Sequence, residues 1–428
     1  MSGPAAAGPG PGPAAGRSTG TGGGGPATSA LAPIGAAEYA ERARTAYASA
    51  QGAAGRGADV IVLFDDQYIQ YFTGFVFSPT ERPIALVVGP GGERVLFVPR
   101  LELEHAEALA DVDRVVAYPE YPGEVHPLEL LLREVRRLGV GRRAIAVDHD
   151  GYPPVMGYAP VRLGELAGVD VVSFSVTLDE QMARKSDHEV ALVRESARWG
   201  AHAHRLLQAG TKPGLTEDAV VGAACAAATR AMNEAFGVPY RQRNKWVRGA
   251  LAIYRGQIGP AGAFPHALAH DATFRVGDTL VTGAAADVWG YLSELERTLF
   301  LGAPSAEQRH YFDHMLALQD LCFTAIRPGA AAASVDLAMR AYVDEHSLWP
   351  HWRHHVGHGL GQRIHESPFL DLGYRGTIEA GMVLSVEPGL YVPGLGGFRH
   401  SDTVLVTTSG IELLTDYPRD IASLTLDV

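Results

Sequence analysis

The sequence predicts two folded domains, an α/β domain over residues 34–180 and an α+β domain over residues 181–428. In the first range, short apolar runs alternate with segments of helical pattern, which is typical of an α/β layered domain. In the second range, helices with clear start signals are separated by several strands. That arrangement favours helices packed over a strongly curved antiparallel sheet.

Residues 1–33 precede these domains and have a different composition. They contain 10 Gly, 6 Pro and 8 Ala, with one charged residue, Arg17. Such a stretch cannot bury enough apolar surface to offset the entropy that ordering would cost. We therefore expect a flexible tail over residues 1–33.

The first domain begins with a helical segment that leads into a strand, and the alternation then continues. Short apolar runs bounded by turn residues indicate strands, and longer periodic segments indicate helices. The expected helices are 36–53, 102–109 and 127–138, and the expected strands are 60–64, 84–88, 94–98, 114–118 and 144–148.

Capping boxes mark the starts of two helices in the second domain. Ser186 with Glu189 precedes a periodic apolar face, and Ser305 with Gln308 opens another helix. Thr216 starts a third helix, because the acidic residues after it suit the positive end of the helix dipole. The expected strands of this domain are 279–283, 289–302, 382–392 and 402–408.

The composition excludes several classes of function. The net charge of −12 argues against a nucleic-acid partner, because nucleic-acid-binding proteins present a basic face. The sequence contains no run of about 18 apolar residues, so we expect no membrane-spanning helix. The two cysteines, Cys225 and Cys322, lie in helix-like apolar segments and indicate buried thiols in a reducing cytosol. We therefore expect a cytoplasmic protein without nucleic-acid or membrane partners.

Histidine is concentrated in one short segment. Five of the 17 histidines fall within residues 351–365, in the text HWRHHVGHGLGQRIHESP. Glycines in this segment let the backbone approach a site closely, and His358 and His365 flank them. We interpret His358 and His365 as functional residues.

Three glutamates form a second group of candidates. Strand alternation places Glu294 and Glu296 on one face, with Leu295 opposite. Two neighbouring carboxylates repel each other unless a metal, a proton or a cation lies between them. Glu387 lies in an otherwise apolar strand, where burial without a partner would be costly. All three glutamates therefore imply partners.

The motifs HHVGHGLG…HESP, GYLSELERTLF and SVEPGLYVPGLGGFRHSD resemble those of the pita-bread superfamily, which includes methionine aminopeptidase, prolidase, aminopeptidase P and creatinase. The resemblance covers the whole second domain in order, and the first domain resembles the amino-terminal domain of creatinase and prolidase. It implies a creatinase/prolidase-like α/β domain followed by a pita-bread α+β catalytic domain.

The resemblance also implies a set of metal ligands. The five ligand positions of the dinuclear metallopeptidases fall on Gly283, Glu294, His358, Glu387 and Ser401. Because two of the five carry no ligand, we expect no dinuclear centre. Two alternatives remain open: a single divalent ion (Mn, Zn or Fe) on the other three residues, or a metal-free centre like that of creatinase.

Comparison with creatinase assigns roles to further residues. It implies that Glu296 and Glu387 contact the substrate, that His266 transfers a proton, and that His365 positions the scissile group. Arg82 matches an arginine that binds the substrate carboxylate from the partner subunit, and Tyr71 would act across the same interface. The resemblance therefore implies a homodimer.

These observations lead to the hypothesis of a hydrolase that cleaves a C–N bond in a small molecule. The substrate would be a guanidino-, amide- or N-substituted amino acid, gripped through a cationic or NH-bearing group by the glutamates. One alternative is a single-metal Xaa-Pro dipeptidase or aminopeptidase. Another is a catalytically inactive pita-bread module that binds a ligand.

Overall fold

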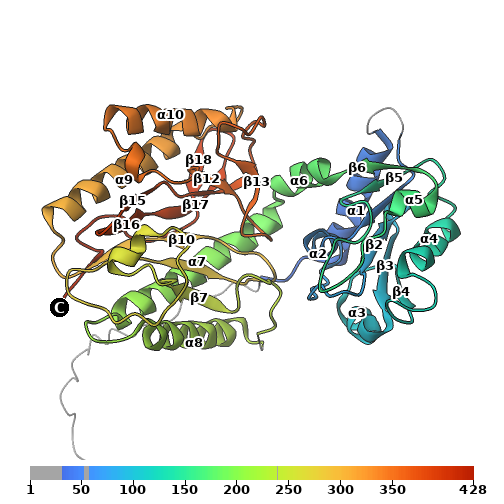
Figure 1. Cartoon of the computed structure of the whole chain (residues 1–428), viewed down its shortest axis with the longest axis horizontal. Helices are drawn as coiled ribbons and strands as arrows, with labels where there is room; N and C mark the ends of the chain where they lie inside the picture. Colours follow the sequence, from blue (N-terminus) through green and yellow to red (C-terminus); the bar gives the residue numbers. More distant parts are fainter. Residues whose placement is uncertain (1–30, 53–56, 239) are drawn as a thin grey trace, which may run out of the picture.

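A six-stranded mixed sheet forms the centre of the first domain (Figure 1). The computed structural model describes residues 31–52, 57–238 and 240–428. The strand order is β4-β3-β2-β1-β5-β6. The strands are β1 (Val60–Leu63), β2 (Ala85–Val88), β3 (Arg94–Pro99), β4 (Arg114–Tyr118), β5 (Ala144–Val147) and β6 (Asp170–Ser173).

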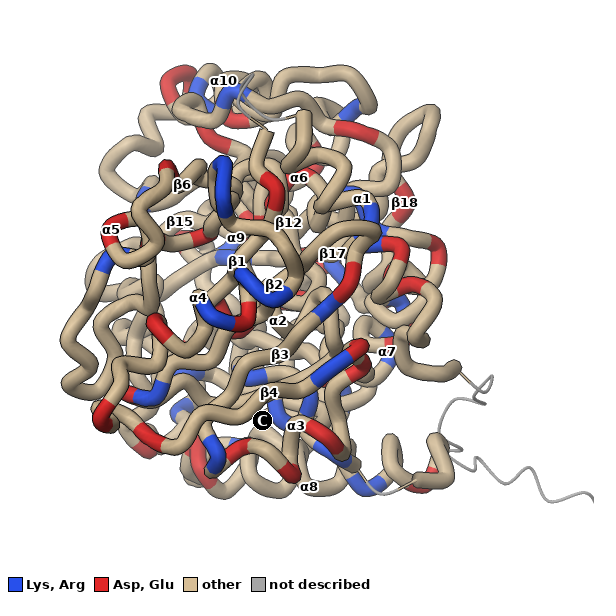
Figure 2. The backbone as a smooth tube through the Cα atoms, turned by 90° about the vertical axis from the view of Figure 1, so that its right-hand side faces the viewer, with Lys and Arg blue, Asp and Glu red and all other residues tan. Residues whose placement is uncertain are grey.

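Helices cover both faces of this sheet, as the alternation in the sequence predicts. Along β1, Ile61 and Leu63 face one core and Val60 and Val62 face the other, because neighbouring side chains in a strand point to opposite faces. The helices are α1 (Ala36–Gly52), α2 (Asp66–Thr73), α3 (Leu103–Leu109), α4 (Pro127–Arg137), α5 (Leu163–Ala167) and α6 (Ser175–Ala183). Figure 2 shows positively and negatively charged residues interspersed along the chain on this side of the molecule.

The second domain is built on an antiparallel sheet, and the expected fold class is confirmed. The strand order is β13-β12-β14-β17-β10-β9-β7, with β18 paired to β17. The strands are β7 (Ala250–Ile253), β9 (Gly283–Ala286), β10 (Leu295–Glu296), β12 (Gly357–Gly359), β13 (Glu366–Phe369), β14 (Val383–Val386), β17 (Ser401–Val406) and β18 (Ile411–Leu413). Smaller sheets join β8 (Thr279–Val281), β11 (Thr298–Leu301) and β19 (Thr425–Leu426), and join β15 (Gly389–Val392) to β16 (Gly396–Arg399).

Four helices pack on this sheet: α7 (Asp187–Gly210), α8 (Glu217–Phe236), α9 (Ala306–Ala325) and α10 (Ala332–Glu345). In Figure 1, α7 and α8 lie on one side of the strands and α9 and α10 on the other. A Cβ at Gly200 of α7 would meet the Ala285 backbone at 3.1 Å, so glycine permits the close approach of α7 to β9. Both expected capping boxes are present, at Ser186/Glu189 and Ser305/Gln308.

Two expected strands are interrupted where the sequence changes the direction of the backbone. The run 289–302 begins with a tight turn, where Trp289 and Gly290 have φ angles of 54° and 96°, and continues as β10 and β11. The run 382–392 divides into β14 and β15 around Glu387 and Pro388. Proline has no backbone N–H to donate to a ladder, which is the physical reason for that break.

The predicted tail and cysteines are only partly described. Residues 1–30 of the expected tail lie outside the described residues. Just after them, Trp289 Nε1 donates to the carbonyl of Leu31 at 3.2 Å, and Ile34 is buried in the second-domain core. Cys322 is buried and Cys225 half-buried, both as free thiols. Within the described residues, no helix combines the length and apolar character needed to span a membrane.

Candidate active site

A cavity of about 120 Å³ lies in the second domain. It is lined by Arg255, His266, Glu294, Glu296, His354, His355, Ile364, His365, Glu387 and Arg399. Every lining residue except Ile364 carries an ionisable side chain, so the cavity suits a small polar or charged ligand. The structure therefore brings five sequence-predicted residues together here: His266, Glu294, Glu296, His365 and Glu387.

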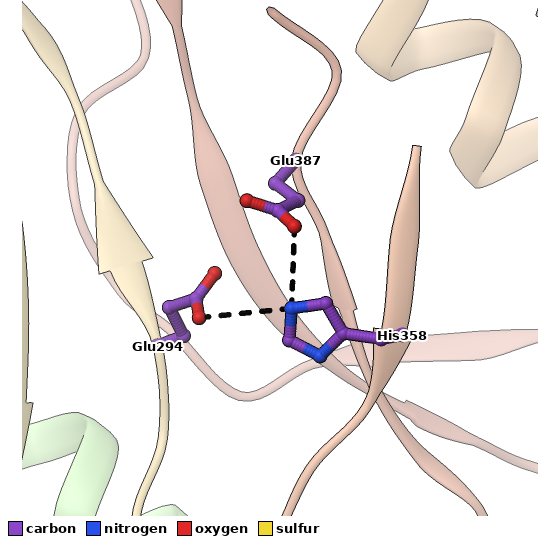
Figure 3. Close-up of side chains that lie close together, drawn as sticks. All are labelled: Glu294, His358 and Glu387. Carbon is purple, nitrogen blue, oxygen red and sulfur yellow. Dashed lines mark ion pairs between the residues drawn. The ribbon is translucent and has the colours of Figure 1, made fainter. Parts of the chain in front are cut away.

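Beside this cavity, Glu294 and Glu387 point toward the same ring nitrogen of His358 (Figure 3). His358 Nε2 lies 3.2 Å from Glu387 Oε1 and 3.9 Å from Glu294 Oε2. One ligand atom from each residue lies within 4.8 Å of the others. Among the residues that the structure describes, this is the only such group of three or more His, Cys, Asp or Glu side chains.

The antiparallel sheet positions the three side chains. His358 lies on β12 opposite Ser385 of β14, Glu387 directly follows β14, and Glu294 directly precedes β10. The glycines beside His358 fit β12 between its neighbours: a Cβ at Gly357 would lie 2.1 Å from the Ser385 carbonyl oxygen. The glycine-rich segment thus lets neighbouring backbones approach the strand that carries the histidine.

The hydrogen bond at the other ring nitrogen determines how His358 faces the carboxylates. His358 Nδ1 lies 2.9 Å from the Gly359 carbonyl oxygen, so Nδ1 carries the proton and donates it. Nε2 is buried and has no well-formed hydrogen bond. Burial lowers the pKa of His358, but Glu387 and Glu294 outweigh that effect and raise the pKa to about 9. A cation, either a second proton or a metal ion, is therefore favoured at Nε2.

The donor set also fits a divalent metal ion. Two carboxylates and one imidazole are ligands that Zn, Mn and Fe accept, and they leave coordination positions open. Glu294 is oriented for this role, because its Oε1 accepts hydrogen bonds from Ser385 Oγ at 2.6 Å and Ser401 Oγ at 2.7 Å. Its Oε2 is the oxygen that faces His358.

Comparison with known families assigns each domain. Residues 191–408 match metallopeptidase family M24, and residues 50–181 match the creatinase/prolidase N-terminal domain. The chain belongs to the M24 family. This membership confirms the pita-bread resemblance and supports a hydrolase that acts on a C–N bond.

Several peptidases are similar to this chain over most of its length. Dipeptidase PepE from Mycobacterium ulcerans has a TM-score of 0.77 and 27% identity, over 93% of this chain and 100% of that chain. Xaa-Pro dipeptidase from Bacillus anthracis has a TM-score of 0.71 and 23% identity, over 92% and 100%, which shows the shared fold. An uncharacterized peptidase of Staphylococcus aureus is 28% identical over 369 residues, 85% of this chain and 96% of its own length.

Two ligand positions implied by the M24 resemblance carry other residues in this chain. Ser401 is buried and donates its hydroxyl to Glu294 instead of offering a carboxylate. A Cβ at Gly283 would lie 3.6 Å from Glu296 Oε1, so the Glu296 carboxylate lies beside the position where an aspartate would begin. The described residues at these two positions therefore offer no second set of metal ligands.

Glu296 is paired with two arginines. Its Oε1 accepts from Arg399 Nη2 at 2.6 Å and from Arg255 Nη2 at 3.0 Å, and its Oε2 contacts Arg399 Nε. Burial raises the pKa of Glu296, and the guanidinium groups oppose that shift. We take Glu296 as ionised, because a protonated carboxyl would leave the buried Arg399 without a counter-ion. The Glu296 carboxylate, which we expected to bind a cationic group of the substrate, thus binds two arginines of the protein itself.

His365 and His266 lie at the exposed side of the cavity. The ring of His365 is 4.1 Å from that of His358, between centroids. Burial and the neighbouring His358 lower the pKa of His365, so its ring is neutral at pH 7. His266 follows the 3₁₀ turn η4 (Gly259–Ala263) in an exposed loop. Both rings can therefore meet a substrate that enters from solvent.

The structure does not bring Arg82 and Tyr71 to the cavity of their own chain. Arg82 lies at the surface of the first domain, where its Nε donates to Glu120 at 2.7 Å. Tyr71 is only 4% exposed, and the Arg42 guanidinium lies 4.2 Å above its ring. Tyr71 is therefore a core residue of the first domain, and action of Arg82 from a partner subunit stays a prediction.

Sequence reasoning missed four residues of the cavity lining as functional candidates. His354 and His355 lie in the histidine-rich segment, and Arg399 lies in the quoted motif GFRHSD, so the sequence contained a signal for these three. Arg255 lies outside every motif. Only the turn after β7 places it beside Glu296.

Proposed function

We propose that the protein is a single-metal hydrolase that cleaves the amide or peptide C–N bond of a small substrate. The observation that carries this proposal is the convergence of Glu294, His358 and Glu387 around a buried imidazole nitrogen without a well-formed hydrogen bond. The likeness to a dipeptidase at 27% identity supports a dipeptide or a similarly small amide as substrate.

In this proposal each side chain has a defined task. A divalent ion on Glu294, His358 and Glu387 would supply Lewis-acid chemistry and an activated water. His365 accepts a hydrogen bond from the substrate at its neutral ring, which orients the scissile amide. His266 delivers a proton to the leaving nitrogen, and such acid–base help is worth roughly 10²–10⁴-fold in rate.

Metal analysis of the purified protein tests the proposal. We expect about one equivalent of Mn, Zn or Fe, and loss of both metal and activity in His358→Ala and Glu294→Gln, because each removes one of three ligands. His310→Ala is the matched control, since His310 lies on the exposed surface of α9 and should leave metal content unchanged. Substrates are sought in a panel of dipeptides, N-substituted amino acids and guanidino acids, with products detected by mass spectrometry.

The principal alternative is a metal-free hydrolase in which a proton on His358 replaces the ion. Its support is the position of the two carboxylates, 3.2 and 3.9 Å from His358 Nε2, which favours a proton there and raises the pKa of His358 to about 9. Activity that survives chelation in protein free of metal would establish this alternative. Saturable binding without turnover of any substrate would favour the inactive binding module. A homodimer and a cytoplasmic location stay predictions.

A further inference from the structure

The turn after β7 holds Arg255 in an uncommon backbone conformation. Arg255 has a φ of 54° and is followed by Gly256 at 71°, so two successive residues are left-handed. The buried Glu217 of α8 accepts the Gly256 N–H at 2.7 Å, and a Cβ at Gly256 would lie 2.3 Å from the Leu268 carbonyl oxygen. A non-glycine residue keeps such a conformation only where its surroundings impose it. The fold therefore fixes the direction in which Arg255 projects.

Two guanidinium groups share the same acceptors on the cavity wall. Glu296 Oε1 accepts from both Arg255 and Arg399. Gln257 Oε1 lies 3.3 Å from Arg255 Nη2 and 3.4 Å from Arg399 Nη2. The two cations are thus bridged by one carboxylate and one amide oxygen.

The two arginines differ in how many of their guanidinium hydrogen-bond donors remain available to a ligand. Arg399 is buried, with contacts to Glu296, Gln257 and the Tyr391 hydroxyl. The Arg255 side chain is 36% exposed and lines the cavity. Only its Nη2 is engaged in the hydrogen bonds described above. The Arg255 guanidinium therefore retains donors that can reach a ligand in the cavity.

The charged side chains around the cavity leave an excess of positive charge at the wall formed by Arg255 and Arg399. A divalent ion at the proposed metal site balances Glu294 and Glu387. Glu296 balances only one of its two arginines. One positive charge of this arginine pair is therefore not balanced by Glu296, and Arg255 is the member of the pair that is exposed to the cavity.

We propose that Arg255 is a specificity-determining residue that binds a carboxylate of the substrate. This inference rests on the proposed single-metal hydrolase and names its substrate class: small amides with a free carboxylate near the scissile C–N bond. A planar guanidinium pairs with a carboxylate through two parallel hydrogen bonds, which gives direction as well as attraction. Glu296 and Gln257 hold the guanidinium in place and are positioning residues for this contact.

The test compares two substrates that differ only in this group, the dipeptide alanylproline and its C-terminal amide. We expect the wild type to prefer the free acid by at least about 10-fold in kcat/KM. Arg255→Gln should raise KM for the acid by roughly 10- to 100-fold, with kcat and the rate on the amide little changed. Arg255→Lys should restore part of the preference, because it keeps the charge without the planar fork. Arg194→Gln, in an exposed ion pair with Glu412, is the matched control.

Calorimetric binding to the metal-loaded protein separates the two proposals. N-acetylalanine should bind to the wild type, bind at least 10-fold more weakly to Arg255→Gln, and bind more tightly than its amide. If the wild type hydrolyses neither dipeptide but shows this binding pattern, the proposed function fails and the carboxylate site stands. An unchanged acid-to-amide ratio in Arg255→Gln, or equal binding of acid and amide to the wild type, overturns the inference.

Discussion

Single residues distinguish this candidate metal site from the dinuclear arrangement implied by the resemblance. Position 283 is a glycine without a side chain, and the Glu296 carboxylate lies next to it. Position 401 is a serine, which offers a hydroxyl instead of a carboxylate. Glu296 is satisfied by two guanidinium groups, so it is engaged elsewhere than at the triad. Two of the three remaining ligand candidates are held by hydrogen bonds: the Ser385 and Ser401 hydroxyls donate to Glu294, and His358 Nδ1 donates to the Gly359 carbonyl oxygen.

Removal of one of these serines should weaken metal binding. Ser401→Ala deletes a hydrogen bond to Glu294 Oε1 and loosens the orientation of that ligand. Outer-shell partners of metal ligands are worth about 10- to 100-fold in metal affinity, so we expect at least a 10-fold loss. Competition with a fluorescent chelator measures the effect.

Ser293→Ala is the matched control for this experiment. Ser293 is also buried and immediately precedes Glu294, but its hydroxyl faces Ser196, 3.1 Å away. Equal affinity loss in both variants would mean that the Ser401 hydrogen bond has no specific role.

At the scale of elements, the segment between β12 and β13 is tied to the start of the second domain. Glu366 Oε1 accepts the backbone N–H groups of Gln362 and Arg363 at 2.9 and 2.8 Å. Its Oε2 accepts from Lys185 Nζ at 2.6 Å, and both side chains are almost fully buried. This ion pair connects Lys185, two residues before α7, to the loop that carries His365.

Lys185→Met should destabilise the protein strongly. Loss of one partner from a buried ion pair leaves an uncompensated charge, which costs about 3–5 kcal/mol. Arg184→Met is the control in the adjacent residue, because the Arg184–Glu379 pair is largely exposed and is worth about 0–1 kcal/mol. Urea denaturation of both variants measures the difference. Similar unfolding free energies would show that the buried pair does not stabilise the fold.

Elements were predictable where their signals are local. The capping boxes at Ser186 and Ser305 depend on residues three positions apart, and both form as expected. The prediction of one continuous strand over 289–302 was wrong, because a left-handed turn at Trp289 and Gly290 interrupts this segment. Tertiary contacts, such as the hydrogen bond that Asn244 Nδ2 donates to the Gly290 carbonyl oxygen at 2.9 Å, stabilise that turn.

Across the whole molecule, the same capping box joins the two domains. Glu189 closes the box at the start of α7, and its Oε1 also accepts from the Tyr291 hydroxyl at 2.8 Å and meets Arg42 of α1 at 3.1 Å. Arg363 of the second domain donates to Asp65 of the first at 2.8 Å. Charged contacts therefore link α1 to α7, and the start of α2 to the segment that carries His365.

Two buried histidines make the stability of the molecule sensitive to acid. Burial and nearby arginines lower the pKa of His204 to about 3 and hold the pKa of His400 well below its usual range. Above pH 6.5 both histidines are neutral in the folded and in the unfolded chain, so they do not change the free energy of unfolding with pH. As the pH falls below 6.5, the unfolded chain takes up protons that the folded chain does not, so stability is lost.

We expect each of these histidines to cost about 2 kcal/mol of unfolding free energy between pH 7 and pH 5. His400→Leu should remove its share of that loss, because His400 has no hydrogen-bond partner for either ring nitrogen and packs against Phe312. Urea denaturation of wild type and variant at the two pH values gives the comparison. An equal acid-induced loss in both proteins would contradict the assignment.

By itself, the sequence determined the two-domain fold class, the helix starts and three metal-ligand candidates, Glu294, His358 and Glu387. These features depend on short spacings and on motifs that occur in order along the chain. The tertiary structure decided which charges meet. Glu296 pairs with Arg255 and Arg399, which are 41 and 103 residues away in sequence. Sheet register and a left-handed turn set those contacts, and no local pattern of apolar and polar residues encodes them.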